Sequence, residues 1–329
     1  MASFDRAHIF SRLKGIFETD ILRERLATII GLGTGGSLAA VELAKCSVGR
    51  FRLIDFDVIE SHNVVRHICG LRDLGRPKTE AVRDAILNFN PYAVVDCHNV
   101  DILDPTVDLS QLLDGSDIVL PCTDTERSKY SINRCLMRLW LERQVSIPAV
   151  YAGAYERAFG GDVIRVVPGE TPCYDCVIGS VQQLPFMATM PRSTVAYSSL
   201  QSADDFRAEP GLGMDVHFLA LIQTKLALMT LLRGTASILG DIPYNFLFWG
   251  NRKEWIFPEP FKAIFAKTER RADCATCGGN AHQQDTISRE EILRNSAEIL
   301  SAAKRAPEDD CTHEVAEIEL PPDLQKYTS

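Results

Sequence analysis

A glycine-rich segment early in the chain has a spacing that could bind phosphate. Gly31, Gly33 and Gly36 match the pattern G-x-G-x-x-G and directly follow the short apolar run at 26–30. Glycines between a strand and a helix let backbone N–H groups approach a phosphate, which the positive end of the helix dipole favours. Asp55 ends the next apolar run, where a carboxylate can hold a ribose hydroxyl. The pattern predicts a nucleotide site; the alternative is a tight turn that binds nothing.

The residues that follow Asp55 indicate which nucleotide is bound. Asp57, Asn63 and Arg66 come soon after the strand end, and Lys78 opens the next predicted helix. Arginine and lysine can neutralise charge on an α-phosphate and on leaving pyrophosphate, whereas hydride transfer needs no such set of cations. The spacing therefore favours a triphosphate. The alternatives are an NAD-dependent oxidoreductase and, for any single residue, a solvated surface charge.

The cysteines form a second pattern. Cys173/Cys176 and Cys274/Cys277 are two Cys-x-x-Cys pairs among ten cysteines, and the others are scattered along the chain. Scattered thiols do not make a disulfide framework, so the layout predicts one metal site in a protein with several small buried thiols. The alternative is a redox Cys-x-x-Cys, which we do not expect because neither pair is predicted to open a helix after a strand.

Alternating strands and helices are predicted around these residues. Short apolar runs that favour strands lie at 26–30, 51–54, 93–98, 117–122 and 146–152. Helical patterns lie between them at 37–45, 78–88, 109–113 and 127–144. A strand, a glycine turn, a helix and a strand form one βαβ unit, and its repetition gives a mostly parallel sheet with helices on both faces. We therefore predict an α/β, Rossmann-like fold.

Changes in periodicity divide the chain into three predicted parts. Residues 1–25 are predicted to form an amphipathic helical segment, residues 26–278 the nucleotide-binding domain, and residues 279–329 a polar helix (288–304) with an acidic tail. Inside the domain we expect a strand at 160–167, a long connection at 177–213 and a helix at 217–233, followed by a hairpin of 245–249 with 254–257.

Composition limits the classes of function. The 329 residues carry 35 Lys and Arg against 44 Asp and Glu, a net charge of −9, which argues against binding to a nucleic-acid backbone. The apolar runs are too short to span a membrane, and the first residues show no secretory signal. We expect a cytoplasmic protein with one large or two modest domains.

Together these segments resemble the ThiF/MoeB/HesA family, the adenylating domain shared with ubiquitin-activating enzymes. The resemblance covers roughly residues 6–278. It is carried by both Cys-x-x-Cys pairs, the helix near 217–233, and the segments 30–36, 55–67, 75–78 and 122–124. It implies ATP-dependent adenylation of a C-terminal carboxylate, with release of pyrophosphate. The implied substrate is a ubiquitin-like or sulfur-carrier β-grasp protein, with a conjugating enzyme or sulfurtransferase acting downstream.

The resemblance also implies roles for residues of the nucleotide site. The glycines Gly31, Gly33 and Gly36 would bind ATP together with Asp57, and Asp55 would hold the ribose. Asn63, Arg66 and Lys78 would contact the phosphates. Positioning and charge neutralisation then do most of the chemistry, because no side chain need become a nucleophile.

Further roles follow from the same resemblance. Asp124 would bind Mg²⁺, which bridges phosphate oxygens. Arg12 would reach the site of the partner subunit in a homodimer, and the implied catalytic residues are Arg12, Arg66, Lys78 and Asp124. Cys173, Cys176, Cys274 and Cys277 would hold a structural Zn²⁺, which takes four thiolates in a tetrahedron.

The chain departs from the family pattern at three places. Thr34 stands in the position of a glycine, and His67 follows Arg66 in place of glutamine. Pro121 and Thr125 replace the acidic residue and the asparagine that flank the Cys-Thr-Asp segment. None of these changes removes a residue assigned to ATP, and we interpret His67 as a satisfied or surface histidine.

Several outcomes within the family stay open. Ubiquitin-activating enzymes proper pass the acyl group to a cysteine, often in the connection that spans 177–213 here, where none occurs. Cys311 is a weak candidate because the neighbouring carboxylates oppose formation of a thiolate. The alternatives are adenylation of a short peptide C-terminus, activation of a tRNA base, which the net charge disfavours, and an idle scaffold for an active partner. A role in a bacterial ubiquitin-like defence pathway is compatible with the first reading.

Overall fold

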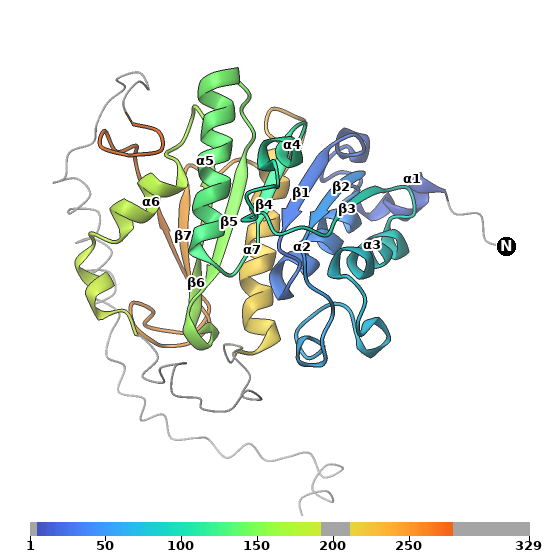
Figure 1. The fold of residues 1–329 in the computed structure, drawn as a ribbon, viewed down its shortest axis with the longest axis horizontal. Coiled ribbons are helices and arrows are strands. Elements are labelled where there is room, and N and C mark those ends of the chain that lie inside the picture. The colour runs from blue at the N-terminus through green and yellow to red at the C-terminus, as the bar shows by residue number, and fades with distance from the viewer. Residues whose placement is uncertain (1–4, 192–210, 279–329) are drawn as a thin grey trace, which may run out of the picture.

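An eight-stranded sheet is the framework of the structure (Figure 1). The computed structural model describes residues 5–191 and 211–278. The strand order is β3-β2-β1-β4-β5-β6-β7-β8; the strands from β3 to β5 are parallel, and β6, β7 and β8 continue the sheet antiparallel. The strands are β1 (Leu26–Ile30), β2 (Arg50–Ile54), β3 (Val94–His98), β4 (Ile118–Pro121), β5 (Ala149–Ala154), β6 (Gly160–Val166), β7 (Phe246–Gly250) and β8 (Lys262–Ala266).

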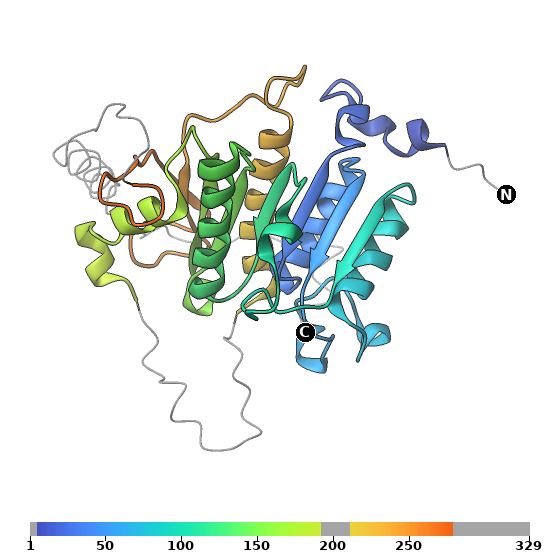
Figure 2. The ribbon, with the colours of Figure 1, turned by 45° about the horizontal axis from the view of Figure 1, so that its top comes forward.

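Helices cover both faces of this sheet (Figure 2). Residues Ile29 and Ile30 of β1 pack into different apolar clusters, one on each face, as the alternation of a strand requires. The predicted α/β fold, with a mostly parallel sheet between two helical layers, is confirmed. One face carries α2 (Thr34–Lys45), α3 (Lys78–Phe89) and α7 (Gly213–Leu231), and the other carries α4 (Leu109–Leu113), α5 (Glu126–Arg143) and α6 (Tyr174–Val181).

The chain path makes a topological switch at β1. β2 and β3 lie on one side of β1, and the chain then crosses to β4 and β5 on the other side. Ile30 is in register with both Ile54 and Pro121, so the carboxyl ends of the three central strands are level. Ligands of open α/β sheets bind outside the carboxyl ends of the strands at such a point. The segments after β1, β2 and β4 therefore meet where a nucleotide is expected.

The N-terminal segment is not the single amphipathic helix that we predicted. It forms one helical turn, α1 (Arg6–Ile9), and the 3₁₀ turns η1 (Ser11–Leu13) and η2 (Thr19–Leu22). Gly15, with φ +85°, separates the two 3₁₀ turns. The helix-like spacing of apolar residues has another cause: Phe10, Phe17 and Leu22 are buried in the core, and Phe17 forms a bridge with Ser237.

Two expectations for the C-terminal half are also corrected. β7 pairs with β8 rather than with 254–257, where only the bridge Glu254–Phe257 forms. The connection at 177–213 begins in regular structure, because α6 continues to Val181 and the 3₁₀ turn η6 (Pro185–Thr189) follows. The rest of that connection, from 192 to 210, and the predicted helix at 288–304 lie outside the described residues.

α7 is the one described helix that is long and apolar enough, by length and composition, to cross a membrane. Half of its apolar window is buried inside the structure. The Gln223 amide donates hydrogen bonds to the carbonyl oxygens of Pro121 at 3.3 Å and Val150 at 2.7 Å. These contacts with β4 and β5 are those of a core helix.

Candidate functional site

The turn between β1 and α2 is so closely packed that two of its glycines have no room for a side chain. Gly31 has φ +87°, and a Cβ there would lie 2.8 Å from the Cys122 backbone. A Cβ on Gly36 would lie 1.9 Å from the Gly31 carbonyl oxygen. A Cβ on Gly33, the N-cap of α2, would meet nothing within 4 Å. The helix start therefore faces open space, where its N–H groups can receive an anion.

Asp55 fixes the conformation of this glycine turn. Its Oδ2 accepts a hydrogen bond from the Leu32 N–H at 2.6 Å, and its Oδ1 accepts one from the Asp57 N–H at 2.8 Å. Burial raises the pKa of Asp55, and the nearby Lys78 ammonium opposes that shift. Because a carboxylate has about four acceptor positions, Asp55 can hold the turn and still accept a hydroxyl hydrogen.

Lys78 is a buried cation at the first residue of α3. The residue is 8% exposed, and its Nζ donates to Asp57 Oδ2 at 2.7 Å. Its backbone N–H donates to the Asp57 carbonyl oxygen at 3.0 Å. The structure thus brings Asp55, Asp57 and Lys78 together beside the glycine turn. An incoming phosphate could replace the Asp57 carboxylate as the partner of the ammonium.

The segment after β2 is tied to the glycine turn by a histidine. His67 Nε2 lies 2.7 Å from the Leu32 carbonyl oxygen, and the Cys69 N–H donates to Nδ1 at 3.0 Å. Since Nδ1 is an acceptor, Nε2 carries the hydrogen. Burial lowers the pKa of His67, which keeps the ring neutral. His67 is a satisfied histidine, as interpreted from the sequence, but its link to the glycine turn had no sequence signal.

Asn63 and Arg66 lie in the same segment, which also contains the 3₁₀ turns η3 (Ser61–Asn63) and η4 (Leu71–Asp73). Asn63 Oδ1 accepts a hydrogen bond from the Glu60 N–H at 3.0 Å and closes η3. The Arg66 carbonyl oxygen lies 3.2 Å from His217 Nε2, and a Cβ on Gly213 would lie 3.1 Å from Arg66 Cα. Arg66 is therefore located where the segment meets the first turn of α7.

Asp124 and Arg12 lie at opposite ends of the sheet. Asp124 is exposed in the turn between β4 and α5, on the edge that holds the glycine turn. Arg12 is exposed in the N-terminal segment, which packs at the far end of α2, where Ser47 Oγ donates to the Thr19 carbonyl oxygen at 2.9 Å. Twelve helical residues span about 18 Å. Arg12 is thus not brought to the glycine turn of its own chain.

Four cysteine side chains form a compact, buried cluster. All four Sγ atoms lie within 4.8 Å of one another, with Cys173–Cys274 at 3.6 Å and Cys176–Cys277 at 3.4 Å. Four sulfurs placed about 2.3 Å from a tetrahedral metal would be about 3.8 Å apart, whereas a disulfide needs about 2.05 Å. The Arg271 N–H donates to Cys176 Sγ at 3.3 Å, a hydrogen bond that stabilises a thiolate. The donors fit a tetrahedral metal site.

The first cysteine pair opens a helix, contrary to our prediction. Cys173 is the N-cap of α6, and Cys176 lies in its first turn. The arrangement nevertheless differs from an isolated redox pair, because Cys274 and Cys277 complete the cluster from a segment far along the chain. The cluster joins the segment after β8 to α6.

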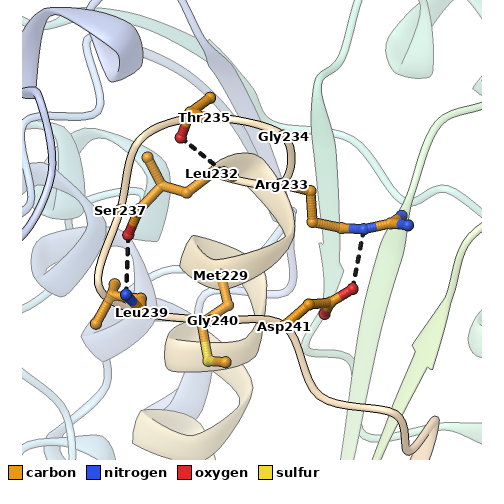
Figure 3. Close-up of a pocket in the computed structure, with 9 residues that line it drawn as sticks. All are labelled: Met229, Leu232, Arg233, Gly234, Thr235, Ser237, Leu239, Gly240 and Asp241. Atoms are coloured by element: carbon orange, nitrogen blue, oxygen red, sulfur yellow. Dashed lines mark hydrogen bonds and ion pairs between the residues drawn. The ribbon is translucent and has the colours of Figure 1, made fainter.

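Two hollows in the surface lie away from these groups. One, of about 310 Å³, is formed by α7 and the loop after it, between Met229 and Asp241 (Figure 3). Arg233 in its wall is already paired with Asp241 at 3.2 Å and with Glu170 at 2.6 Å. The other, of about 600 Å³, lies between residues 102–109 and α5. Neither hollow includes the glycine turn, which opens to solvent at the sheet edge.

Comparison with known proteins identifies the family. The profile described as "ThiF family" matches residues 6–251. The chain belongs to the ThiF family. It is similar to ubiquitin-like modifier-activating enzyme 5 of Caenorhabditis elegans (29% identical over 186 residues) and of Dictyostelium discoideum (30% over 169 residues). The alignments cover 53% and 47% of this chain and 42% of each relative, so this ThiF-family chain spans less than half the length of these relatives.

Solved structures share the fold of this ThiF-family chain. A crystal structure of E. coli MccB with ATP gives a TM-score of 0.55 at 18% identity, covering 79% of this chain and 68% of MccB. A crystal structure of E. coli MccB with AMPCPP and MccA gives a TM-score of 0.56 at 18% identity, with the same coverage of both chains. A crystal structure of PaaA gives 0.56 at 16% identity, covering 81% of this chain and 76% of PaaA.

Proposed function

We propose that this ThiF-family chain is an adenylyltransferase that uses ATP to activate the C-terminal carboxylate of a small protein. The observation that carries the proposal is the meeting of the glycine turn with Asp55, Asp57 and Lys78 at one edge of the sheet. The relatives are named ubiquitin-like modifier-activating enzymes, which favours a ubiquitin-like or sulfur-carrier β-grasp protein as substrate. A conjugating enzyme or sulfurtransferase would then take over the activated carboxylate.

The proposed reaction needs positioning and charge neutralisation rather than a protein nucleophile. A substrate carboxylate oxygen attacks the α-phosphorus; an O–P bond forms while the bond to pyrophosphate breaks. The N–H groups at the start of α2 receive phosphate oxygens, and Lys78 exchanges Asp57 for a phosphate. Arg66 approaches from the segment after β2. Asp124 would hold Mg²⁺, which supplies positive charge to the phosphates.

A short peptide is the second candidate substrate. The fold matches that of MccB, which has been crystallised with MccA. The connection at 177–213 contains no cysteine, so an acyl-adenylate would not be passed to a thiol there. That absence suits a peptide as well as a sulfur-carrier protein, because neither requires a thioester.

Exchange of labelled pyrophosphate into ATP tests the proposal. The purified chain, ATP and Mg²⁺ are mixed with each candidate β-grasp protein or with peptides that have a free C-terminus. We expect label to enter ATP only when the substrate is present. Exchange with a β-grasp protein selects the first substrate class, and exchange with peptides alone selects the second. ATP binding without exchange in every mixture would contradict the proposal and favour an idle scaffold.

Two glycine variants separate nucleotide binding from folding. Gly33→Ala is expected to change the unfolding free energy by no more than about 1 kcal/mol, because the new Cβ meets no atom within 4 Å. It should weaken ATP binding at least about tenfold, since the methyl group stands where phosphate approaches the helix start. Gly36→Ala should cost at least about 3 kcal/mol, because its Cβ overlaps the Gly31 carbonyl. Denaturant unfolding and calorimetric titration with ATP measure both effects; unchanged ATP affinity of Gly33→Ala would place the phosphate elsewhere.

A homodimer would place Arg12 at a nucleotide site. Arg12 is exposed and lies at the far end of α2 from the glycine turn of its own chain, so a role at a nucleotide site requires the site of another copy. We infer that two chains associate with each Arg12 near the partner's phosphates. Light scattering should show a dimer at assay concentrations, and a monomer with full exchange activity would contradict this inference.

Zinc is the metal that we propose for the cysteine cluster. Four thiolates in a closed tetrahedron are typical of structural Zn²⁺ and leave no open position for catalysis. Among the described residues the remaining cysteines are free thiols, a state that suits a reducing, cytoplasmic location. The proposed role of the metal is to anchor the segment after β8, not to act in the reaction.

A further inference from the structure

Lys129 places a buried ammonium group beneath the end of β5. Its side chain is 7% exposed, and it lies on the first turn of α5. Side chains of a helix tilt toward the helix N-terminus, so Lys129 extends toward the sheet edge that carries Asp124. Its Nζ donates to Glu126 Oε1 at 3.1 Å, the one acceptor within hydrogen-bonding distance among the described residues. A lysine has three N–H groups, so two remain for another partner.

Gly153 of β5 leaves the room that this ammonium occupies. A Cβ on Gly153 would lie 3.2 Å from Lys129 Nζ and 3.4 Å from Asp162 Oδ1. Asp162 lies directly across from Gly153 on β6. A cation and a carboxyl group thus flank the same glycine from two different elements.

Lys129 and Asp162 form no hydrogen bond with each other in the described structure, although the nearby ammonium opposes the rise that burial causes in the pKa of Asp162. Glu126 holds the ammonium, and the Tyr155 hydroxyl is hydrogen-bonded to Asp162. Tyr174 in turn donates to Glu126 Oε2 at 2.8 Å, which fixes that carboxylate. Burial raises the pKa of Asp162 to about 6, so it is an ionised acceptor at pH 7.5. An unsatisfied donor and an acceptor therefore face Gly153 together.

The position of this pair relative to the nucleotide residues suggests its ligand. β5 is the parallel neighbour of β4, so Gly153 lies beside the turn that carries Asp124. Asp55 and Lys78 lie on the opposite side of the glycine turn, after β2. ATP bound by Asp55 and Lys78 would leave the side of the site next to β5 open to the substrate that carries the carboxylate. An extended peptide backbone presents one C=O acceptor and one N–H donor at each residue, which matches the pair.

We propose that Lys129 and Asp162 bind the backbone of the substrate's C-terminal tail and align its carboxylate with the α-phosphate. The Lys129 ammonium donates to a tail carbonyl, and the Asp162 carboxylate accepts from a tail N–H. The missing side chain of Gly153 leaves room for both groups to stand at the end of β5. Neither residue gains or loses a proton in the reaction. This inference rests on the proposed adenylation and adds to it the residues that bind the substrate.

Lys129→Met, compared with Lys45→Met, tests the role of the cation. Lys45 pairs with Glu42 at 2.7 Å in the same i, i+3 geometry but is more exposed and lies at the other end of the sheet, so it controls for loss of such an ion pair away from the site. In pyrophosphate exchange we expect Lys129→Met to raise the KM for the substrate about 10–100-fold, the loss typical of a hydrogen bond from a charged donor. The KM for ATP should stay unchanged, and Lys129→Arg should restore part of the loss.

A substrate with an ester in place of the penultimate amide tests the role of Asp162. With the unaltered enzyme, the ester should support weaker exchange than the amide substrate, because the ester lacks the N–H. With Asp162→Ala, which has no acceptor, the ester and the amide substrate should support equal exchange. An unchanged substrate KM in Lys129→Met, or an equal rise in the KM for ATP, would overturn the inference while leaving adenylation in place. Absence of exchange by the unaltered enzyme with every substrate would overturn both.

Discussion

Replacing Asp124 with alanine is expected to lower the rate of adenylation about 100–1000-fold, the effect typical of removing one electrostatic contact to a transition state. Asp124 is exposed in the turn between β4 and α5, level with the glycine turn. If it holds Mg²⁺, its loss leaves the charges of the triphosphate and of the attacking carboxylate opposed. The fold should be unaffected because the carboxylate is on the surface.

Asp114 offers a matched control for this variant. Asp124 follows β4, whereas Asp114 precedes it and is exposed at the opposite edge of the sheet. Pyrophosphate exchange at saturating substrate and varied Mg²⁺ should show full activity for Asp114→Ala. Partial rescue of Asp124→Ala by high Mg²⁺ would support a metal contact. Full activity of Asp124→Ala at low Mg²⁺ would show that Asp124 does not hold the metal.

If the cysteine cluster holds zinc as proposed, removing the metal is expected to lower the thermal unfolding temperature by roughly 10 °C. Structural zinc contributes about 10–16 kcal/mol in isolated zinc-finger peptides. Because this protein has a larger core of its own, we expect loss of the metal to lower its unfolding free energy by a smaller amount, on the order of 5 kcal/mol. The segment from 267 to 278 contains no helix or strand and reaches α6 through Cys274 and Cys277. Proteolysis should therefore begin within that segment once the metal is lost.

Cys274→Ser and Cys46→Ser form the test pair for the metal. Cys46 is a half-buried thiol at the C-cap of α2, outside the cluster. Elemental analysis should find one zinc per chain in the unaltered protein and in Cys46→Ser, and substoichiometric zinc in Cys274→Ser. Metal-free protein with unchanged unfolding temperature and protease resistance would contradict the anchoring role.

The parallel half of the sheet was predictable because its signals are local. β1, β2 and α4 were predicted within one residue of their observed bounds, since short apolar runs are bracketed by glycine, proline or acidic residues. Gly31 and Asp55 were singled out for the same reason, because they directly follow the ends of β1 and β2. Their meeting at one edge then follows from parallel topology.

The errors concern features that depend on distant contacts. β8 was missed because Lys262–Ala266 is an edge strand whose pairing with β7 is set by packing rather than by its own alternation. The N-terminal segment has helical spacing, yet its apolar residues are buried by the ends of α2 and α7. Lys129 was placed in a predicted helix with no sign of its burial, because only the tertiary structure sets it against Gly153.

The most direct test of the central claim is the mass of the substrate after reaction. The β-grasp protein or peptide that supports exchange is incubated with the enzyme, ATP and Mg²⁺, and its intact mass is measured. The proposed function predicts a substrate that gains one adenylyl group at its C-terminus and is converted to a hydroxamate by hydroxylamine, with release of AMP. A substrate that gains a phosphoryl group with formation of ADP, or that is unmodified while ATP is consumed, would contradict adenylation by this chain.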